Sequence, residues 1–279
     1  MNFDNSLSVL ACQIHVPCTT NAQIRNRHLE DTSRLVVDQL VEQHSDLVLL
    51  PELSSIDYSR DSFERLSELS EDIEGQSFQV WREVAKKHRT TVLYSFPRVE
   101  AGRYYISIAA VGPDGEIIGV YDKMHSAQFG ESMEKEYFSR GKRMLTLRVK
   151  DFVIAPIICY DIRIPEMSRA LALEHNVDVI LHAGAYYRDE SFYSWHHFAV
   201  TRAIENQVYF LSLNRAGDNY GNSIFCGPWV DETAPPMLFS EKQEDFHRLI
   251  IDRGAISRAR ERYSFLKDRF SHYPANENS

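Results

Sequence analysis

A cysteine at the end of an apolar run is the residue of this chain best placed to do chemistry. Residues 152–158 are apolar and rich in β-branched side chains, which is typical of a buried strand. Cys159 follows this run directly, and Pro165 stands where the first turn of a helix accepts a proline. Free backbone N–H groups and the helix dipole at such a junction stabilise an anion, and they can lower the pKa of a cysteine. We therefore expect Cys159 to be a nucleophile, although a cysteine considered alone is more often a small buried apolar residue.

A glutamate and a lysine also stand at the ends of strand-like runs. Glu52 follows residues 47–51, an apolar run closed by a proline that ends a strand ladder. Lys123 follows the short apolar run of residues 117–121. Each of the two alone would usually be a solvated surface side chain. In open α/β sheets, however, functional groups gather at the carboxyl ends of strands, so the sequence predicts that Glu52, Lys123 and Cys159 form one site.

The elements that would position these residues alternate along the chain. Short apolar runs predict strands, and apolar residues at helical spacing predict helices. The predicted strands span residues 7–13, 47–50, 91–96, 106–111, 117–121, 152–158, 177–182, 208–213 and 249–251, and the predicted helices span 29–41, 78–88, 165–174 and a stretch around 195–203. This alternation predicts an α/β fold. Because no Gly/Ser-rich or Pro-rich linker interrupts it, we expect a single domain over residues 1–270, followed by a polar tail at 271–279.

The three strand-end segments together resemble the nitrilase, or carbon–nitrogen hydrolase, superfamily, whose members carry a Glu–Lys–Cys triad. Glu52 stands after a Leu-Pro pair and Lys123 stands two residues before His125, as in the family. Cys159 opens a Cys-x-Asp-x-Arg-x-Pro-Glu motif, the most specific of these matches. The resemblance covers residues 8–255, approximately, and implies a four-layer α-β-β-α sandwich.

The resemblance also implies a chemical role for each site residue. Cys159 would attack as the thiolate and form a thioester acyl-enzyme. Glu52 would take the thiol proton, hand it to the departing amine and then activate water, which requires burial to raise its pKa toward neutrality. Lys123 and the backbone N–H of Tyr160 would stabilise the oxyanion.

Further residues are candidates for supporting roles. A second family glutamate, Glu134, would orient Lys123 or the substrate nitrogen, although Glu136 stands two residues away and could be mistaken for it. Asp161 and Arg163 are expected to brace the turn after the nucleophile, as a helix N-terminal residue and an ion-pair residue. The remaining candidates are His125, as a hydrogen-bonding residue behind the triad, and the substrate-binding residues Tyr58, His182 and Tyr186, the last of which could equally be a core aromatic residue.

The residues after the nucleophile favour an amide substrate over a nitrile. True nitrilases usually carry Trp-Glu there, whereas this chain has Tyr160 and Asp161, as in the amidase and carbamoylase branches. We expect hydrolysis of a small carboxamide with release of ammonia. Residues 133–138 also resemble the N-carbamoyl amidohydrolases, which release ammonia and carbon dioxide from a ureido group, and this is the alternative. The turn that contains Asn in many members begins here with His182, so the pocket loops depart from the family pattern.

The same residues leave room for other classes of function. A papain-like peptidase would use His125 or His182 as its base, and it would depend on that histidine rather than on Glu52. A catalytically silent small-molecule-binding protein could retain the pocket, but a binding protein has no need of an intact Glu–Lys–Cys set. A structural role confined to an oligomer is the least favoured class.

Composition sets the remaining limits. The 279 residues are 43% hydrophobic and 25% charged, as in an ordinary globular protein, and a net charge of −9 disfavours nucleic acid as a partner. No apolar run approaches the ~18 residues of a membrane helix, and the amino end lacks a secretory signal pattern. Four scattered cysteines without a CxxC pair predict neither a disulfide framework nor a zinc site, and the adjacent His196 and His197 point too far apart to chelate one metal. We expect a cytoplasmic enzyme without metal or cofactor that acts on a small molecule and, by the resemblance, forms at least a homodimer.

Overall fold

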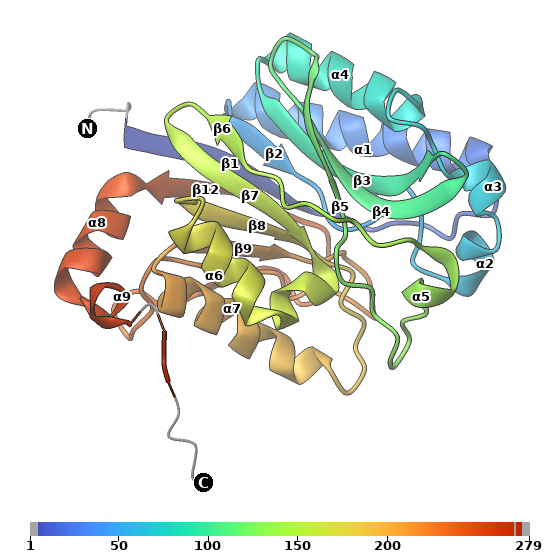
Figure 1. The fold of residues 1–279 in the computed structure, drawn as a ribbon. Helices are drawn as coiled ribbons and strands as arrows, with labels where there is room; N and C mark the ends of the chain where they lie inside the picture. The colour runs from blue at the N-terminus through green and yellow to red at the C-terminus, as the bar shows by residue number, and fades with distance from the viewer. Residues whose placement is uncertain (1–4, 271, 275–279) are drawn as a thin grey trace, which may run out of the picture.

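The computed structural model describes residues 5–270 and 272–274. In this part of the chain, two six-stranded sheets pack face to face, and helices cover the outer face of each sheet (Figure 1). This layering confirms the predicted four-layer α-β-β-α fold. The predicted tail, residues 271–279, lies outside the described residues except for 272–274.

The two sheets share a plan in which three parallel strands lie in the middle and antiparallel strands lie at the edges. The first sheet has the order β12-β1-β2-β3-β4-β5, with β1, β2 and β3 parallel to one another. Its strands are β1 (Ser6–Gln13), β2 (Leu47–Leu49), β3 (Thr91–Glu100), β4 (Arg103–Val111), β5 (Ile117–Asp122) and β12 (Asp245–Asp252). The second sheet has the order β11-β10-β9-β8-β7-β6, with β7, β8 and β9 parallel. Its strands are β6 (Leu147–Val149), β7 (Phe152–Ile158), β8 (Val179–Ala183), β9 (Tyr209–Leu213), β10 (Ile224–Cys226) and β11 (Met237–Leu238).

Four helices form the outer layers. Helices α1 (Ala22–Glu42) and α4 (Gln76–His88) cover the first sheet, and α6 (Pro165–Leu173) and α7 (Phe192–Asn206) cover the second (Figure 1). The remaining helical elements connect the layers or close the chain: α2 (Arg60–Phe63), α3 (Leu66–Leu69), α5 (Glu134–Tyr137), the 3₁₀ helix η2 (Cys159–Arg163), α8 (Arg253–Arg262) and α9 (Phe265–Asp268).

The alternation of side chains along a strand divides the core into two clusters. On β1, Val9 and Ala11 join the cluster between the two sheets, whereas Leu10 and Cys12 join the cluster beneath α1 and α4. Successive side chains of a strand point to opposite faces, so an apolar strand of the first sheet fills both clusters, whereas both faces of the second sheet belong to the first cluster, which also includes Trp195 of α7. This explains why the central strands read as continuous apolar runs rather than as alternating ones.

Most of the predicted elements are present, and their ends differ for identifiable reasons. Helix α1 begins at Ala22 rather than near residue 29, because the side chain of Asn21 caps it by accepting the Ile24 N–H at 3.0 Å. Pro165 is the first residue of α6, as predicted. Helix α8 was not predicted, since it starts directly after a strand, where Asp252 caps it by accepting the N–H of Gly254.

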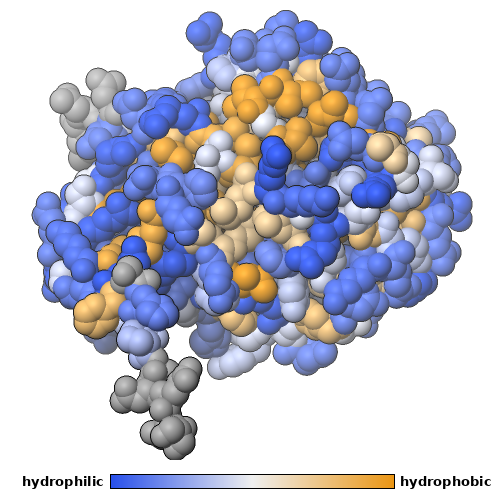
Figure 2. Space-filling model, viewed as in Figure 1, coloured by the Kyte–Doolittle hydropathy of each residue, from blue (hydrophilic) through white to orange (hydrophobic). Residues whose placement is uncertain are grey.

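Figure 2 shows one face of the molecule, on which hydrophilic residues surround apolar patches, the most extensive of them near the upper centre of the view. Scattered exposed apolar side chains are ordinary on a folded protein. None of the helices in the described part of the chain has the length and apolar character needed to cross a membrane.

Candidate active site

Glu52 is fully buried in a turn just beyond β2, and several hydrogen bonds hold that turn. The next residue, Leu53, has a φ of 46°, a left-handed conformation that costs a non-glycine residue about 1–3 kcal/mol. The hydroxyl of Ser95 on β3 accepts the Leu53 N–H at 2.9 Å. Arg215 donates to the carbonyl oxygens of Glu52, Leu53 and Ile56 at 2.7 to 3.0 Å. These contacts fix the direction in which the Glu52 carboxylate points.

Arg215 is a residue of the site that the sequence pattern marks only by its place after a strand. Arg215 comes two residues after β9 and next to Asn214, so it too follows the end of a parallel strand. Its side chain is almost fully buried and bonds carbonyl oxygens rather than a carboxylate. A buried arginine of this kind can be recognised only once the fold brings the turn after β2 beside it.

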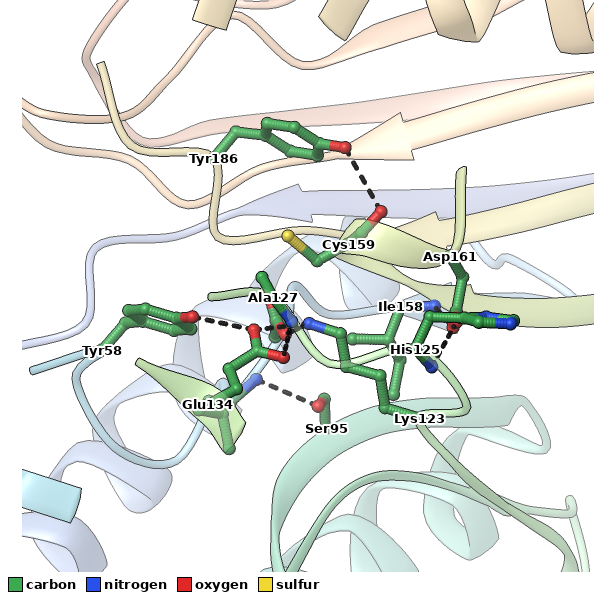
Figure 3. A network of polar contacts seen from close by, with 12 residues as sticks. Tyr58, Ser95, Lys123, His125, Ala127, Glu134, Ile158, Cys159, Asp161 and Tyr186 are labelled. Carbon is green, nitrogen blue, oxygen red and sulfur yellow. Dashed lines mark hydrogen bonds and ion pairs between the residues drawn. The ribbon is translucent and has the colours of Figure 1, made fainter. Parts of the chain in front are cut away.

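Lys123 joins the two buried glutamates of the site. Its Nζ atom donates to Oε1 of Glu52 at 2.7 Å. The same atom donates to Oε1 of Glu134 at 2.6 Å (Figure 3). Glu134, at the start of α5, also accepts from the hydroxyl of Tyr58 at 2.7 Å and from the backbone N–H of Ala127 at 2.9 Å. The structure therefore brings Glu52, Lys123 and Glu134 together, as the sequence predicts.

Burial and the three charges set the proton affinities of this cluster. Burial raises the pKa of Glu52, the ammonium of Lys123 opposes that rise, and the nearby Glu134 carboxylate adds to it. Burial alone would lower the pKa of Lys123, but the charges of Glu134 and Glu52 outweigh it and hold that pKa well above its usual range. Oε2 of Glu52 is buried and has no hydrogen-bond partner among the described residues. Glu52 thus has a raised pKa and a free oxygen, the two properties that a general base requires.

Cys159 follows β7 directly and opens η2 with a φ of 42°. This left-handed conformation is uncommon for a residue with a side chain and marks a strained turn. In Figure 3 the sulfur atom lies between Tyr186 and the Lys123–Glu134 pair. The charges of Glu52, Lys123 and Glu134 all act on the thiol. Cys159 therefore belongs to the same cluster.

The pKa of the Cys159 thiol differs from the sequence prediction. Burial, and after it the Glu52 carboxylate, raises the pKa of Cys159 well above its usual range, although Lys123 and the backbone N–H of Ala185 act in the opposite direction. The sequence indicates a strand–helix junction that would lower this pKa. This pKa is raised instead, because the element at the junction is only a short 3₁₀ helix and because the sulfur is enclosed. A neutral thiol needs a base to remove its proton as it attacks, and the Glu52 carboxylate is close enough for its charge to act on the thiol.

The carbonyl oxygen of Cys159 is held by two neutral donors from the second sheet. His182 on β8 contacts it through Nε2 at 2.9 Å, and the hydroxyl of Tyr186 donates to it at 3.2 Å. His182 is fully buried and lies beneath the nucleophile, not on the pocket wall, so the substrate-binding role predicted for it is corrected. Tyr186 and Tyr58 do line the pocket.

Asp161 braces the turn after the nucleophile. Its carboxylate accepts the backbone N–H of Ile158 at 3.0 Å, the hydroxyl of Tyr121 at 2.5 Å and the backbone N–H of His125 at 3.0 Å. The His125 ring also contacts it, through Nδ1 at 2.8 Å. His125 therefore lies behind the triad, where the sequence places it. Since the rings of His125 and His182 bond other groups, neither is positioned as the base of a papain-like pair.

Arg163 makes no ion pair with any carboxylate of the described residues, contrary to the sequence prediction. The Asp161 carboxylate already accepts hydrogen bonds from the backbone N–H groups of Ile158 and His125. The guanidinium of Arg163 lies instead over the rings of Phe129 and Phe198, each at 5.1 Å, and of Tyr160 at 5.9 Å. Its Nη2 atom is buried without a hydrogen-bond partner in the described part of the chain. This group borders the pocket.

A small pocket lies beside Cys159, and its wall holds both aromatic and polar residues. The wall is built from four segments: the turn around Tyr58, the loop that includes Phe129 and Ser132, the stretch from Cys159 to Arg163, and the residues after β8 that include Tyr186. Tyr160, predicted as an oxyanion contact through its backbone, contributes to this wall. Within residues 5–270 and 272–274, no group of three or more His, Cys, Asp or Glu side chains could hold a metal ion.

Comparison with known proteins agrees with this geometry. A family model described as carbon-nitrogen hydrolase matches residues 11–252. The chain is 30% identical over 208 residues to an (R)-stereoselective amidase of Pseudomonas sp, covering 74% of this chain and 73% of the relative. It is 27% identical over 210 residues to an omega-amidase of Homo sapiens, with 71% and 75% covered. The structure of Nit3 from Saccharomyces cerevisiae, a member of branch 10 of the nitrilase superfamily, superposes with a TM-score of 0.82 at 24% identity, covering 95% of this chain and 97% of Nit3. The chain therefore belongs to the carbon–nitrogen hydrolase family.

Proposed function

We propose that the protein is a thiol amidase that hydrolyses a small carboxamide to a carboxylic acid and ammonia. The observation that carries this proposal is the buried Lys123, which bonds Glu52 and Glu134 together beside the thiol of Cys159. The amidases to which the chain is similar support the same class of reaction. Each residue of the cluster has a task in that reaction.

In the first half-reaction, the sulfur of Cys159 attacks the amide carbon while Oε2 of Glu52 takes the thiol proton. The carbonyl oxygen becomes an oxyanion, and the Lys123 ammonium stabilises it. The C–N bond then breaks, and Glu52 returns its proton to the nitrogen so that ammonia leaves. The product is a thioester between the acyl group and Cys159.

In the second half-reaction, water replaces ammonia. Glu52 takes a proton from the water as its oxygen attacks the thioester carbon, and Lys123 again stabilises the oxyanion. The C–S bond breaks, the proton passes to the sulfur, and the carboxylic acid leaves. Charge remains balanced throughout, because the proton only moves between the Glu52 carboxylate and groups next to it.

A second candidate is the hydrolysis of an N-carbamoyl amino acid. Arg163 is the one basic residue among the described residues that line the pocket, and its Nη2 atom lacks a partner there. A substrate carboxylate would satisfy that nitrogen, although Glu131 and Asp189 line the same pocket and repel a carboxylate. The Arg163 contact would also suit a carboxamide that carries a carboxylate at its other end, so it does not separate the two reactions.

An ammonia-release screen tests the proposal. The wild-type protein and Cys159→Ala would be given small carboxamides with and without a carboxylate, N-carbamoyl amino acids, N-carbamoyl amines and nitriles, with carbon dioxide followed in parallel. Ammonia alone, lost in the variant, would establish the amidase. Ammonia with carbon dioxide would favour the carbamoyl alternative. Tight ligand binding without turnover of any compound would favour a binding protein instead.

The compartment and the oligomeric state are part of the same proposal. All four cysteines are free, and a reducing cytoplasm would keep the nucleophile as a thiol. A homodimer is the oligomeric state that the family resemblance implies. Light scattering coupled to gel filtration would measure the mass in solution, and a monomer at every concentration would rule the dimer out.

A further inference from the structure

The backbone of the nucleophile is held by a chain of neutral groups that the proposed reaction does not use. Cys159 has a left-handed φ of 42°, and its carbonyl oxygen accepts from His182 and Tyr186. Behind His182, the Nδ1 atom contacts the hydroxyl of Ser212 at 2.6 Å, and the Nε1 atom of Trp195 donates to the same hydroxyl at 2.7 Å. These residues come from β8, β9 and α7, so the chain links three elements of the second sheet and its helix layer.

The chemistry of the three groups fixes the direction of every hydrogen bond in this chain. The indole of Trp195 can only donate, so the Ser212 oxygen accepts from it. The Ser212 proton is then free to point at Nδ1 of His182, which accepts it. A neutral imidazole that accepts at Nδ1 carries its own proton on Nε2, and this nitrogen faces the Cys159 carbonyl. Burial lowers the pKa of His182 to about 4, so the ring stays neutral at ordinary pH.

Trp195 supports both donors of the Cys159 carbonyl. Its ring stacks on Tyr186 with centroids 4.7 Å apart and planes 6° apart. Its Nε1 atom fixes Ser212 and, through it, His182. Trp195, Ser212 and His182 are fully buried, so no water competes for these hydrogen bonds.

We propose that His182, oriented by Ser212 and Trp195, is a positioning residue that holds Cys159 in its left-handed conformation with the thiol facing the pocket. A non-glycine residue stays in that conformation only when its surroundings over-determine it. The two donors on its carbonyl oxygen supply that constraint without adding a charge beneath the sulfur. The inference rests on the proposed function only in taking Cys159 as the nucleophile.

Thiol alkylation measures the position of the sulfur without any assumption about the substrate. Iodoacetamide would be added to the whole protein, where sulfur displaces iodide, and mass spectrometry would follow modification at Cys159. His182→Leu should slow alkylation and lower kcat by about ten- to a hundredfold with KM little changed, because the carbonyl loses a donor and the turn relaxes. His182→Gln, which keeps a donor of similar reach, should recover most of the loss.

A matched pair of tryptophan variants separates this role from packing. Trp195→Phe keeps an aromatic ring beside Tyr186 but removes the Nε1 donor, and it should slow alkylation by about three- to tenfold. Trp81→Phe is the control, because Trp81 is equally buried and its Nε1 has no hydrogen-bond partner in the described residues. The control should leave alkylation and kcat unchanged.

Each outcome bears on the proposal. A folded His182→Leu protein with alkylation within twofold of the wild type would overturn it, as would a fall in kcat without any change in alkylation. If His182→Leu does not fold, equal effects of Trp195→Phe and Trp81→Phe would overturn it. A wild-type protein that hydrolyses no amide would count against the proposed function alone, since the alkylation rates would still report on the thiol.

Discussion

The two sheets supply halves of the site that are built from opposite kinds of group. Beyond the strands of the first sheet lie charges: Lys123 bonds Glu52 at 2.7 Å and Glu134 at 2.6 Å, all of them buried. On the second sheet, the two groups that hold the carbonyl of Cys159, His182 and Tyr186, are neutral, and the one buried carboxylate named there, Asp161, braces the turn behind the nucleophile. The nucleophile sits where the two halves meet.

This difference separates two requirements of one reaction. Proton transfer and oxyanion stabilisation need charges, and charges act strongly where water is excluded. Orientation of the nucleophile needs directional bonds, and a charge beneath the sulfur would disturb its proton affinity. We therefore predict that substitutions of Glu52, Lys123 or Glu134 alter the stability of the protein and the pH dependence of its activity. Substitutions of the neutral groups that hold Cys159 should alter chiefly the rate of the reaction.

The largest effect is expected from Glu52→Gln. The amide keeps the shape of the side chain but cannot take the thiol proton, so kcat/KM should fall by roughly 10²–10⁴-fold. The measurement is ammonia release on the best amide substrate, with circular dichroism to check the fold. Retention of more than a tenth of the activity would show that another group serves as the base.

Lys123→Met should lower both activity and stability. Without its ammonium, Glu52 and Glu134 remain as two buried carboxylates close together. Breaking a buried ion pair on one side costs about 3–5 kcal/mol of unfolding free energy, and loss of an oxyanion donor costs about 10²–10³ in turnover. Urea denaturation and steady-state kinetics measure the two effects.

The double variant Lys123→Met/Glu134→Gln is the control for this charge argument. It removes one of the two unpaired carboxylates, so part of the lost stability should return while the activity stays low. Equal stability of the single and double variants would contradict the role of buried charge.

The pH dependence of the activity should depend directly on Glu52, which belongs to the charged half of the site. The pKa of Glu52 is raised above its ordinary 4.5, so below the raised value it is protonated and cannot act as a base. Activity should therefore rise with pH through a midpoint above 4.5. Because the Glu134 charge contributes to the rise, Glu134→Gln should move this acid limb to lower pH. His182→Gln, in the neutral half, should leave the limb where it is, and an equal shift in both variants would remove the distinction between the halves.

Sequence patterns predict the charged half better than the neutral half. Glu52, Lys123 and Cys159 each follow a strand-like run, so local patterns single out these three residues. Glu52 and Lys123 follow strands of the first sheet, however, and Cys159 follows a strand of the second, so only the packing of the two sheets brings them together. His182, Ser212 and Trp195 lie inside their elements, where nothing in the spacing indicates that their polar atoms form a chain. The fold alone brings them into contact.

Two errors in the sequence interpretation have physical causes. The thiol pKa was expected to be low because the junction pattern is visible in the sequence, whereas the burial that raises it is a tertiary property. The sequence predicts an ion pair for Arg163, but the structure shows none in the described residues. Asp161 instead accepts hydrogen bonds from backbone N–H groups. In addition, two side chains that are two residues apart on a helix do not face each other. In both cases a local pattern was overridden by the packing around it.

The smallest effect is expected from Glu136→Gln, the counterpart of Glu134→Gln two residues away. The family resemblance selects Glu134 but leaves room to confuse it with Glu136, and the structure separates them: Glu134 is fully buried against Lys123 and Tyr58, whereas Glu136 pairs with the exposed Arg60 at 2.9 Å. Glu134→Gln should lower kcat by about ten- to a hundredfold, because a buried charged partner of Lys123 is lost. Glu136→Gln should change kcat by less than about twofold, because solvent screens an exposed pair. Kinetics of both variants at the pH optimum measure the contrast, and equal losses would mean that the charged half extends to the surface of the molecule.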